Sequence, residues 1–243
     1  GCIEQITSGV FPQLFLSEIA DLNPERLASI QRNVTAGIRT LAGLQMANGG
    51  FAYWPGTATA DDWGTSYAGH FLIEAEKQGY SIPGNVRKQW LAWQRKAAQQ
   101  WRYYEPLRND LPQAYRLYTL ALAGSPDLAA MNRLRETTEI SGDARYRLAA
   151  AYALAGQKNA ASALLARAVT SPQDDDLYFG SPERNTAMQL ETLMLLGRKP
   201  EAFRKAVTLS KALSSGAWMS TQTTAYSLMA YTKFARFNGS GGI

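Results

Sequence analysis

The sequence has 243 residues, of which 46% are hydrophobic and 19% charged, enough apolar material for the core of one large domain or at most two. This composition excludes disordered, collagen-like and disulfide-stapled proteins, and no apolar run approaches the ~20 residues that cross a membrane. The 25 lysines and arginines exceed the 20 acidic residues only modestly and are scattered, so we expect no nucleic-acid partner.

Metal and disulfide chemistry are poorly supported. Cys2 is the only cysteine and His70 the only histidine, so neither an internal disulfide nor a cluster of Cys and His ligands can form. The acidic run Asp174–Asp176 lacks the glycine and final glutamate of a calcium loop and is interpreted as a solvated turn. We therefore expect no metal ion and no cofactor.

Helical periodicity dominates the chain. Apolar residues recur at steps of three and four from Pro24 to Met46, which predicts a helix. The same pattern, interrupted by glycine and proline, predicts nine more helices over 63–79, 83–101, 111–123, 126–138, 143–155, 158–170, 183–196, 199–213 and 218–236. With the segment after Gln5 this makes about eleven helices, which would form five or six antiparallel hairpins in an open solenoid or a closed ring.

Two segments favour the closed ring. Gln45–Trp54 is a Gly-Gly turn followed by aromatic residues, which would fill the space between adjacent hairpins. At the start of the last helix, Ser220 or Thr221 is expected to cap the helix with Trp218 packed beneath it. No period of a regular solenoid is present, so the predicted fold is an all-α ring. Of its tryptophans, Trp90, Trp93 and Trp101 lie at helical spacing, as core residues do.

The sharpest chemical signal is the amino-terminal segment Gly1-Cys2-Ile3-Glu4-Gln5. The Cys2 thiol can displace ammonia from the Gln5 carboxamide, which closes an internal thioester in a ring of about fifteen atoms if the backbone turns as at a helix start. Such a bond is an acyl donor, because an amine or hydroxyl attacks the Gln5 carbonyl carbon and the Cys2 thiolate leaves. The alternative is an unmodified thiol with a chance match.

This segment resembles the thioester motif Gly-Cys-x-Glu-Gln of the α2-macroglobulin and complement family. Stretches along nearly the whole chain are also similar to bacterial α2-macroglobulins: Thr7–Ser8, Phe11–Pro12, 45–54, 63–67, 79–83, 113–120, 178–181 and 218–225. The resemblance implies an α/α toroid of about six helical hairpins. It also implies that residues 1–243 are a single thioester-containing domain of a much larger protein.

The resemblance implies a stoichiometric protease inhibitor, which is not an enzyme. In this family a protease cuts a bait region elsewhere in the parent protein, and the exposed thioester then acylates a lysine of that protease. Here Cys2 would supply the thiol and Gln5 the acyl carbon, with Glu4 as a spacer within the motif. The implied partners are target proteases and other domains of the parent, a lipoprotein of the periplasm or cell envelope; this domain itself would not insert into a membrane.

One departure concerns the acyl acceptor. Complement members that prefer hydroxyl targets use a histidine more than a hundred residues after the cysteine, where this chain has the segment Trp101–Glu105. The missing histidine favours direct attack by an amine. Tyr103 and Tyr104 from this segment are candidates for shielding the thioester, whereas His70 is expected to cap or pad a helix face.

Two alternative functions stay open from the sequence alone. The Gly-Gly-Phe turn is also typical of α/α-toroid enzymes such as prenyltransferases and terpene cyclases. However, this sequence has few of the residues that their zinc site and acidic motif require. A helical-repeat protein-binding module, in which Cys2 is incidental, is the other alternative.

Overall fold

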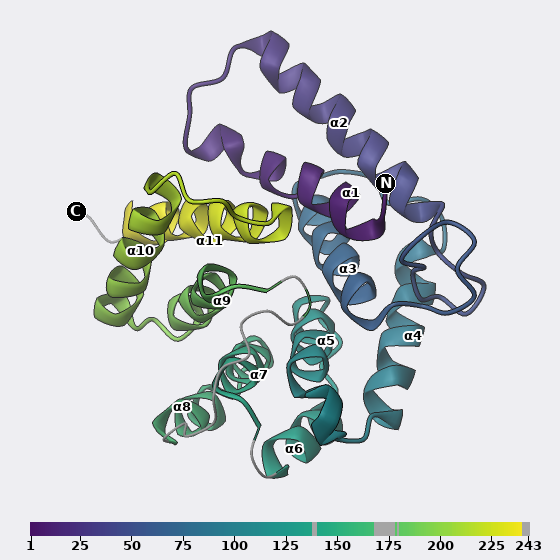
Figure 1. Ribbon diagram of the computed structural model, residues 1–243, viewed down its shortest axis with the longest axis vertical. Helices are drawn as coiled ribbons and strands as arrows, with labels where there is room; N and C mark the ends of the chain where they lie inside the picture. Colours follow the sequence, from purple (N-terminus) through teal and green to yellow (C-terminus); the bar gives the residue numbers. More distant parts are fainter. Residues whose placement is uncertain (138–139, 168–177, 179, 240–243) are drawn as a thin grey trace.

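The computed structural model describes residues 1–137, 140–167, 178 and 180–239. Within these residues the chain forms eleven α-helices and two isolated β-bridges (Figure 1). The helices are α1 (Ile3–Val10), α2 (Pro24–Ala42), α3 (Asp62–Lys77), α4 (Val86–Gln100), α5 (Asp110–Leu122), α6 (Leu128–Glu136), α7 (Gly142–Leu154), α8 (Lys158–Ala166), α9 (Pro182–Leu195), α10 (Lys199–Ser214) and α11 (Thr221–Gly239). Two short 3-10 segments precede α2 and one precedes α5.

The all-α prediction is confirmed, and the expected helices are present within a few residues of their predicted ends. Side chains at their starts explain the agreement: Asn23, Asp61, Ser141 and Ser181 each accept a hydrogen bond from a backbone N–H in the first turn of the helix that follows. The first long helix is shorter than expected and ends at Ala42, because the chain then enters the glycine turn.

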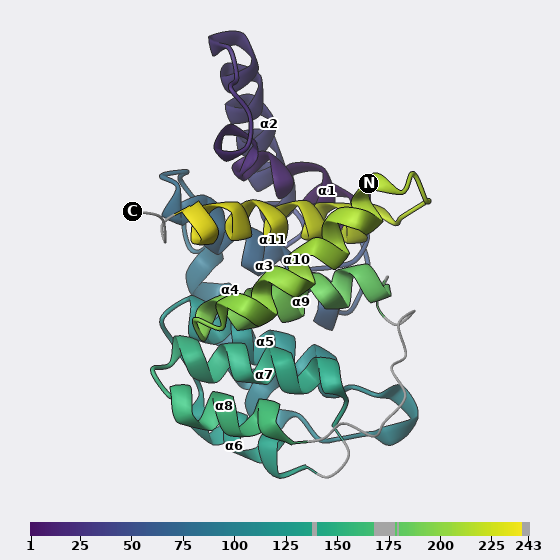
Figure 2. The ribbon, with the colours of Figure 1, turned by 90° about the vertical axis from the view of Figure 1, so that its left-hand side faces the viewer.

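The odd-numbered helices form a closed inner ring. α1 packs on α3, α3 on α5, α5 on α7, α7 on α9, α9 on α11, and α11 packs back on α1 (Figure 1). Each even-numbered helix lies against the odd helix before it, on the outside of the ring. The described residues therefore form five hairpins and a sixth inner helix, α11, in an α/α toroid. Because every outer helix returns the chain, the inner helices run in one direction (Figure 2).

Glycine allows two close approaches near the amino-terminal side of this ring. Gly69 lies in α3, where the indole of Trp90 from α4 occupies the space that a Cβ would need. The Trp90 Nε1–H donates to the carbonyl oxygen of Thr65 at 2.9 Å, which fixes the indole across α3. In the glycine turn, Gly49 has a φ of +96° and lies against the backbone of Gln89, so only glycine fits there.

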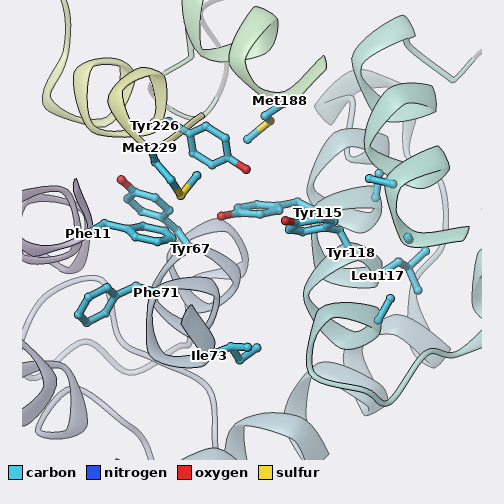
Figure 3. Close-up of a cluster of buried hydrophobic side chains, with 14 of the residues drawn as sticks. Phe11, Tyr67, Phe71, Ile73, Tyr115, Leu117, Tyr118, Met188, Tyr226 and Met229 are labelled. Atoms are coloured by element: carbon cyan, nitrogen blue, oxygen red, sulfur yellow. The ribbon is translucent and has the colours of Figure 1, made fainter. Parts of the chain in front are cut away.

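The inner helices are buried on nearly all sides, so their polar residues face the centre of the ring. Figure 3 shows rings of Tyr67, Tyr115, Tyr118 and Tyr226 gathered between α3, α5 and α11. A buried arginine of α7, Arg147, lies among them, with its guanidinium 4.2 Å from the centre of the Tyr118 ring. This placement combines apolar packing with a cation–π contact.

Five charged or titratable residues form a central charge cluster: His70, Glu74, Arg147, Glu191 and Lys233. Arg147 donates to Glu191 at 2.9 Å, and Lys233 bridges Glu191 and Glu74 with ion pairs of 3.4 and 3.0 Å. His70 Nε2 lies 3.8 Å from Glu74. The cluster joins α3, α7, α9 and α11 through the middle of the ring.

The pKa values in the cluster follow from this pairing. Burial alone would raise the pKa of Glu191, but Lys233 and Arg147 outweigh it and lower that pKa from 4.5 to about 2. The pKa of Glu74 is also lowered, because Lys233 and His70 overcome the effect of burial. Burial lowers the pKa of His70 below its usual 6.5. At neutral pH the cluster therefore holds paired charges beside an uncharged imidazole.

The structure places His70 in the core. It is fully buried in the inner helix α3, and its Nδ1 lies 2.9 Å from the Tyr115 hydroxyl on α5. It packs against the face of the first inner helix through an edge-on contact with Phe11, whose ring centre is 4.9 Å away.

Two tryptophan predictions need correction. Trp218 is 89% exposed and does not pack beneath the cap of α11, although Ser220 does cap that helix by accepting from the Thr223 N–H at 3.1 Å. Trp90 is a core residue as expected, whereas Trp93 and Trp101 are only half-buried because α4 belongs to the outer layer.

Candidate functional site

The first helix begins at the predicted reactive pair. Cys2 is the N-cap of α1, with an extended backbone (φ −78°, ψ 164°), and the turn of helix that follows brings Gln5 back over it. The Gln5 N–H donates to Cys2 Sγ at 3.5 Å, and the Cys2 N–H donates to Gln5 Oε1 at 3.4 Å. This reciprocal arrangement is a capping box in which a thiol takes the place of the usual hydroxyl.

The two side chains differ in exposure. Cys2 is buried, with 3% of its surface exposed, whereas Gln5 is exposed on the surface of the helix. The sulfur therefore faces the interior of the domain, and the carboxamide faces solvent. A nucleophile from outside can approach the Gln5 carbonyl carbon without displacing the core.

Glu4 has a structural role that the sequence did not reveal. Its buried carboxylate accepts hydrogen bonds from Ser8, one turn along α1, at 2.9 Å and from Thr221, at the start of α11, at 2.8 Å. The Ser8 hydroxyl in turn lies 3.0 Å from the hydroxyl of Tyr67 on α3. Glu4 is thus more than a spacer, because it ties the first inner helix to the last.

Tyr53, from the glycine turn, lies beside the first turn of α1. The Ile3 N–H donates to the Tyr53 carbonyl oxygen at 3.0 Å. Burial, with the neighbouring Cys2 adding to it, raises the pKa of Tyr53 above its usual 10.0. We call Cys2, Glu4, Gln5 and Tyr53 the reactive edge. The sequence had assigned Tyr53 to packing between hairpins only.

Close packing holds α1 against α3. A Cβ on Gly64 would approach Ile3 Cγ2 to 2.7 Å, so a side chain at this position would push α1 outward. Trp63, the preceding residue, is buried and stacks on Tyr178 with ring centres 5.3 Å apart. The guanidinium of Arg184 lies over the Trp63 indole at 4.6 Å. This stack connects the start of α3 with the start of α9.

Tyr103 and Tyr104 lie in the segment between α4 and α5. The Tyr103 ring packs on Trp101, with centres 6.3 Å apart, and the Tyr104 N–H donates to the Asn109 side chain at 2.9 Å. Tyr104 is 55% exposed. Their shielding of the reactive pair stays a prediction. The acidic run Asp174–Asp176 lies outside the described residues.

Among the residues that the structure describes, no three His, Cys, Asp or Glu side chains are grouped so that they could hold a metal ion. None of the helices within the same residues combines the length and the apolar character that a membrane crossing requires.

The toroid with this amino-terminal pair is similar to bacterial α2-macroglobulins, which confirms the resemblance seen in the sequence. The chain is 29% identical to alpha-2-macroglobulin of Escherichia coli strain K12 over 251 residues, covering 91% of this chain and 15% of that protein. It therefore spans less than a fifth of the length of this relative. No family model matches the chain.

Solved structures agree with this comparison. Native Escherichia coli alpha-2-macroglobulin, in a crystal structure from domain MG7 to the C-terminus, has a TM-score of 0.80 and 27% identity over 96% of this chain and 40% of that chain. Salmonella alpha-2-macroglobulin reacted with methylamine has a TM-score of 0.79 and 26% identity over 95% of this chain and 16% of that chain.

Proposed function

We propose that Cys2 and Gln5 form an internal thioester, and that this chain is the acyl-donating domain of a bacterial α2-macroglobulin-like protease inhibitor. The observation that carries the proposal is the reciprocal capping box with a buried sulfur and an exposed carboxamide. Ordinary helices also have capping boxes, but here the N-cap atom is a thiol that can attack the carboxamide folded back over it.

The chemistry follows from these positions. Closure joins Cys2 Sγ to Gln5 Cδ and releases the amide nitrogen as ammonia. A lysine amine then attacks Gln5 Cδ from the solvent side, the C–S bond breaks, and the amine proton ends on the thiol. Negative charge develops on Gln5 Oε1 during the attack, and the Cys2 N–H already donates to this oxygen at 3.4 Å. One bond is made per target, so the domain acts stoichiometrically.

The class of target protein is inferred from the relatives. Escherichia coli alpha-2-macroglobulin has been solved as activated by porcine elastase and as activated by trypsin. We infer by this similarity that proteases are the covalent partners here, that a bait region lies elsewhere in a larger parent, and that the parent is a lipoprotein of the periplasm or cell envelope. With no histidine beside the pair in this structure's described residues, amines are the expected acceptors.

The intact mass of the complete protein, with and without methylamine, tests the proposal. A closed thioester lowers the encoded mass by that of one ammonia molecule, and methylamine then adds its own mass and frees one thiol. Cys2→Ala is expected to abolish both changes, whereas Gln13→Glu, at a glutamine outside the capping box, leaves them intact. A wild-type protein with the encoded mass and a freely titrating thiol would overturn the proposal.

A further inference from the structure

The side chain of Glu4 lies in a network of hydrogen bonds that joins three inner helices. Its Oε1 accepts from the Thr221 hydroxyl of α11 at 2.8 Å and from the Ser8 hydroxyl of α1 at 2.9 Å. The Ser8 hydroxyl lies 3.0 Å from the hydroxyl of Tyr67 on α3. One buried carboxylate oxygen therefore connects the first turn of α1 with α11 directly and with α3 through Ser8.

The residue before Glu4 is held from another side. The Ile3 side chain is fully buried and lies against Gly64 of α3. Ile3 and Glu4 are the two residues between Cys2 and Gln5. The backbone that links the reactive pair is thus anchored to α3 through one residue and to α11 through the other.

Resting on the proposed thioester, we infer that Glu4 is a positioning residue for the closure of that bond. Its backbone is part of the cycle of about fifteen atoms that closure creates, and its side chain fixes this backbone to α11. When Cys2 Sγ joins Gln5 Cδ, the thiol proton leaves with the amide nitrogen as ammonia, and Glu4 exchanges no atom. It acts by keeping Sγ and Cδ in the orientation that the reaction needs.

The first turn of α1 needs such an anchor. The helix has eight residues, and a helix of this length has little stability of its own, so tertiary contacts decide whether its first turn forms. The Glu4–Thr221 bond supplies one of these contacts from the last inner helix. The geometry of the reactive pair therefore depends on the docking of α11, and a change at Thr221 should reach Cys2 and Gln5.

The test measures the closed fraction of three variants of the complete protein by intact mass. Glu4→Ala removes the acceptor and Thr221→Val removes the donor on α11. We expect each to lower the ratio of closed to open protein by about tenfold. Glu4→Gln keeps an oxygen that can accept from both hydroxyls and should retain most of the closed fraction.

A destabilised control separates positioning from a loss of overall stability. Leu164 is buried in the outer helix α8, far from α1 in the toroid (Figure 1). Leu164→Ala should lower the melting temperature by loss of apolar packing and leave the closed fraction unchanged. Thr221→Val should do the reverse, with a small change in melting temperature and a large loss of closure.

Three results would overturn the inference. These are a Glu4→Ala protein as fully closed as wild type, a Leu164→Ala protein that loses as much closure as Glu4→Ala, and a Glu4→Gln protein that behaves like Glu4→Ala. If Glu4→Ala does not fold, Thr221→Val decides against Leu164→Ala in the same way. A wild-type protein with the encoded mass and no methylamine uptake overturns the proposed function itself, and this inference with it.

Discussion

The central charge cluster and the reactive edge are two buried polar regions of one ring, and they differ in how completely their groups are enclosed. In the cluster, Arg147 and Glu191 are almost inaccessible and lie 2.9 Å apart between the neighbouring inner helices α7 and α9. At the reactive edge, Cys2 is equally buried, but the side chain it meets, Gln5, is exposed. The Arg147–Glu191 pair faces only protein, whereas the reactive edge faces protein on one side and solvent on the other.

The difference in exposure suits the two regions to different roles, the cluster to stability and the reactive edge to chemistry. Breaking a buried ion pair by removing one partner is costly, so we expect the Arg147–Glu191 pair to contribute to the stability of the ring. A polar pair at the boundary of the core can combine a dry sulfur with an accessible carbon. Both regions use hydrogen bonds between inner helices, and only their exposure differs.

The largest effect is expected from Arg147→Met, which removes one partner of the central ion pair. Glu191 would keep Lys233 and the Tyr226 hydroxyl but lose the guanidinium of Arg147, and we expect the free energy of unfolding to fall by about 3–5 kcal/mol. Urea denaturation measures this loss. Arg204→Met, on an exposed face of α10, should change it by less than about 0.5 kcal/mol. An Arg147→Met variant as stable as wild type would show that the cluster does not hold the ring.

The next largest effect is expected from acid, which should weaken the central charge cluster. The pKa of Glu191 falls from 4.5 to about 2 on folding, so its contribution is complete above pH 4.5 and is lost as the pH drops towards 2. The lowered pKa of His70 adds to this, because the unfolded chain takes up a proton below pH 6.5 that the buried imidazole resists. We expect a loss of roughly 3 kcal/mol from Glu191 alone, seen as a falling melting temperature.

Two glutamate variants check this pH dependence. Glu191→Gln should flatten the decline of melting temperature below pH 4.5, even though its stability at neutral pH is lower. Glu25→Gln, at an exposed position of α2, should follow the wild-type curve. If Glu191→Gln declines as steeply as wild type, other carboxylates govern the acid transition.

A smaller effect is expected where a helix needs a glycine. Gly69→Ala in α3 would collide with the Trp90 indole, and we expect a loss of about 1–3 kcal/mol from overpacking. Gly9→Ala in α1 meets open space and should stabilise the protein by about 0.5–1 kcal/mol, because alanine favours a helix more than glycine does. Chemical denaturation of the two variants gives opposite signs. A stabilised Gly69→Ala would contradict the close contact of α3 with α4.

The smallest effect on stability should come from the reactive edge. Thr221→Val removes the donor to Glu4, and since this contact is partly exposed we expect a loss of about 1 kcal/mol. Thr224→Val, one turn along α11 and exposed, is the matched control and should be near neutral. The comparison would fail if Thr221→Val destabilised the protein as much as Arg147→Met.

The helices and the reactive pair were predictable because their signals are local. Asn23, Asp61 and Ser181 each cap the expected helix through contacts within one turn. The spacing of Cys2 and Gln5 is likewise one turn, so their meeting depends only on a helix beginning there. For these features, short-range geometry decides the structure.

The remaining features depend on residues far apart in the chain. Nothing near Glu4 in the sequence indicates a bond to Thr221, 217 residues away. The complete burial of His70 likewise depends on the helices that close around α3 and not on the residues beside it in the sequence. Trp218 shows the converse, since a large apolar residue stays exposed where no other helix covers it.

The contact between α1 and α11, which closes the ring, has a consequence for the order of folding. Joining segments separated by 217 residues has a large loop-closure entropy cost, so we expect the hairpins to form before the ring closes. The Glu4–Thr221 bond and the packing of α1 on its neighbours are then among the last contacts made. Until that moment we expect the Cys2 thiol to be solvated. Completion of the ring thus controls when the sulfur becomes enclosed.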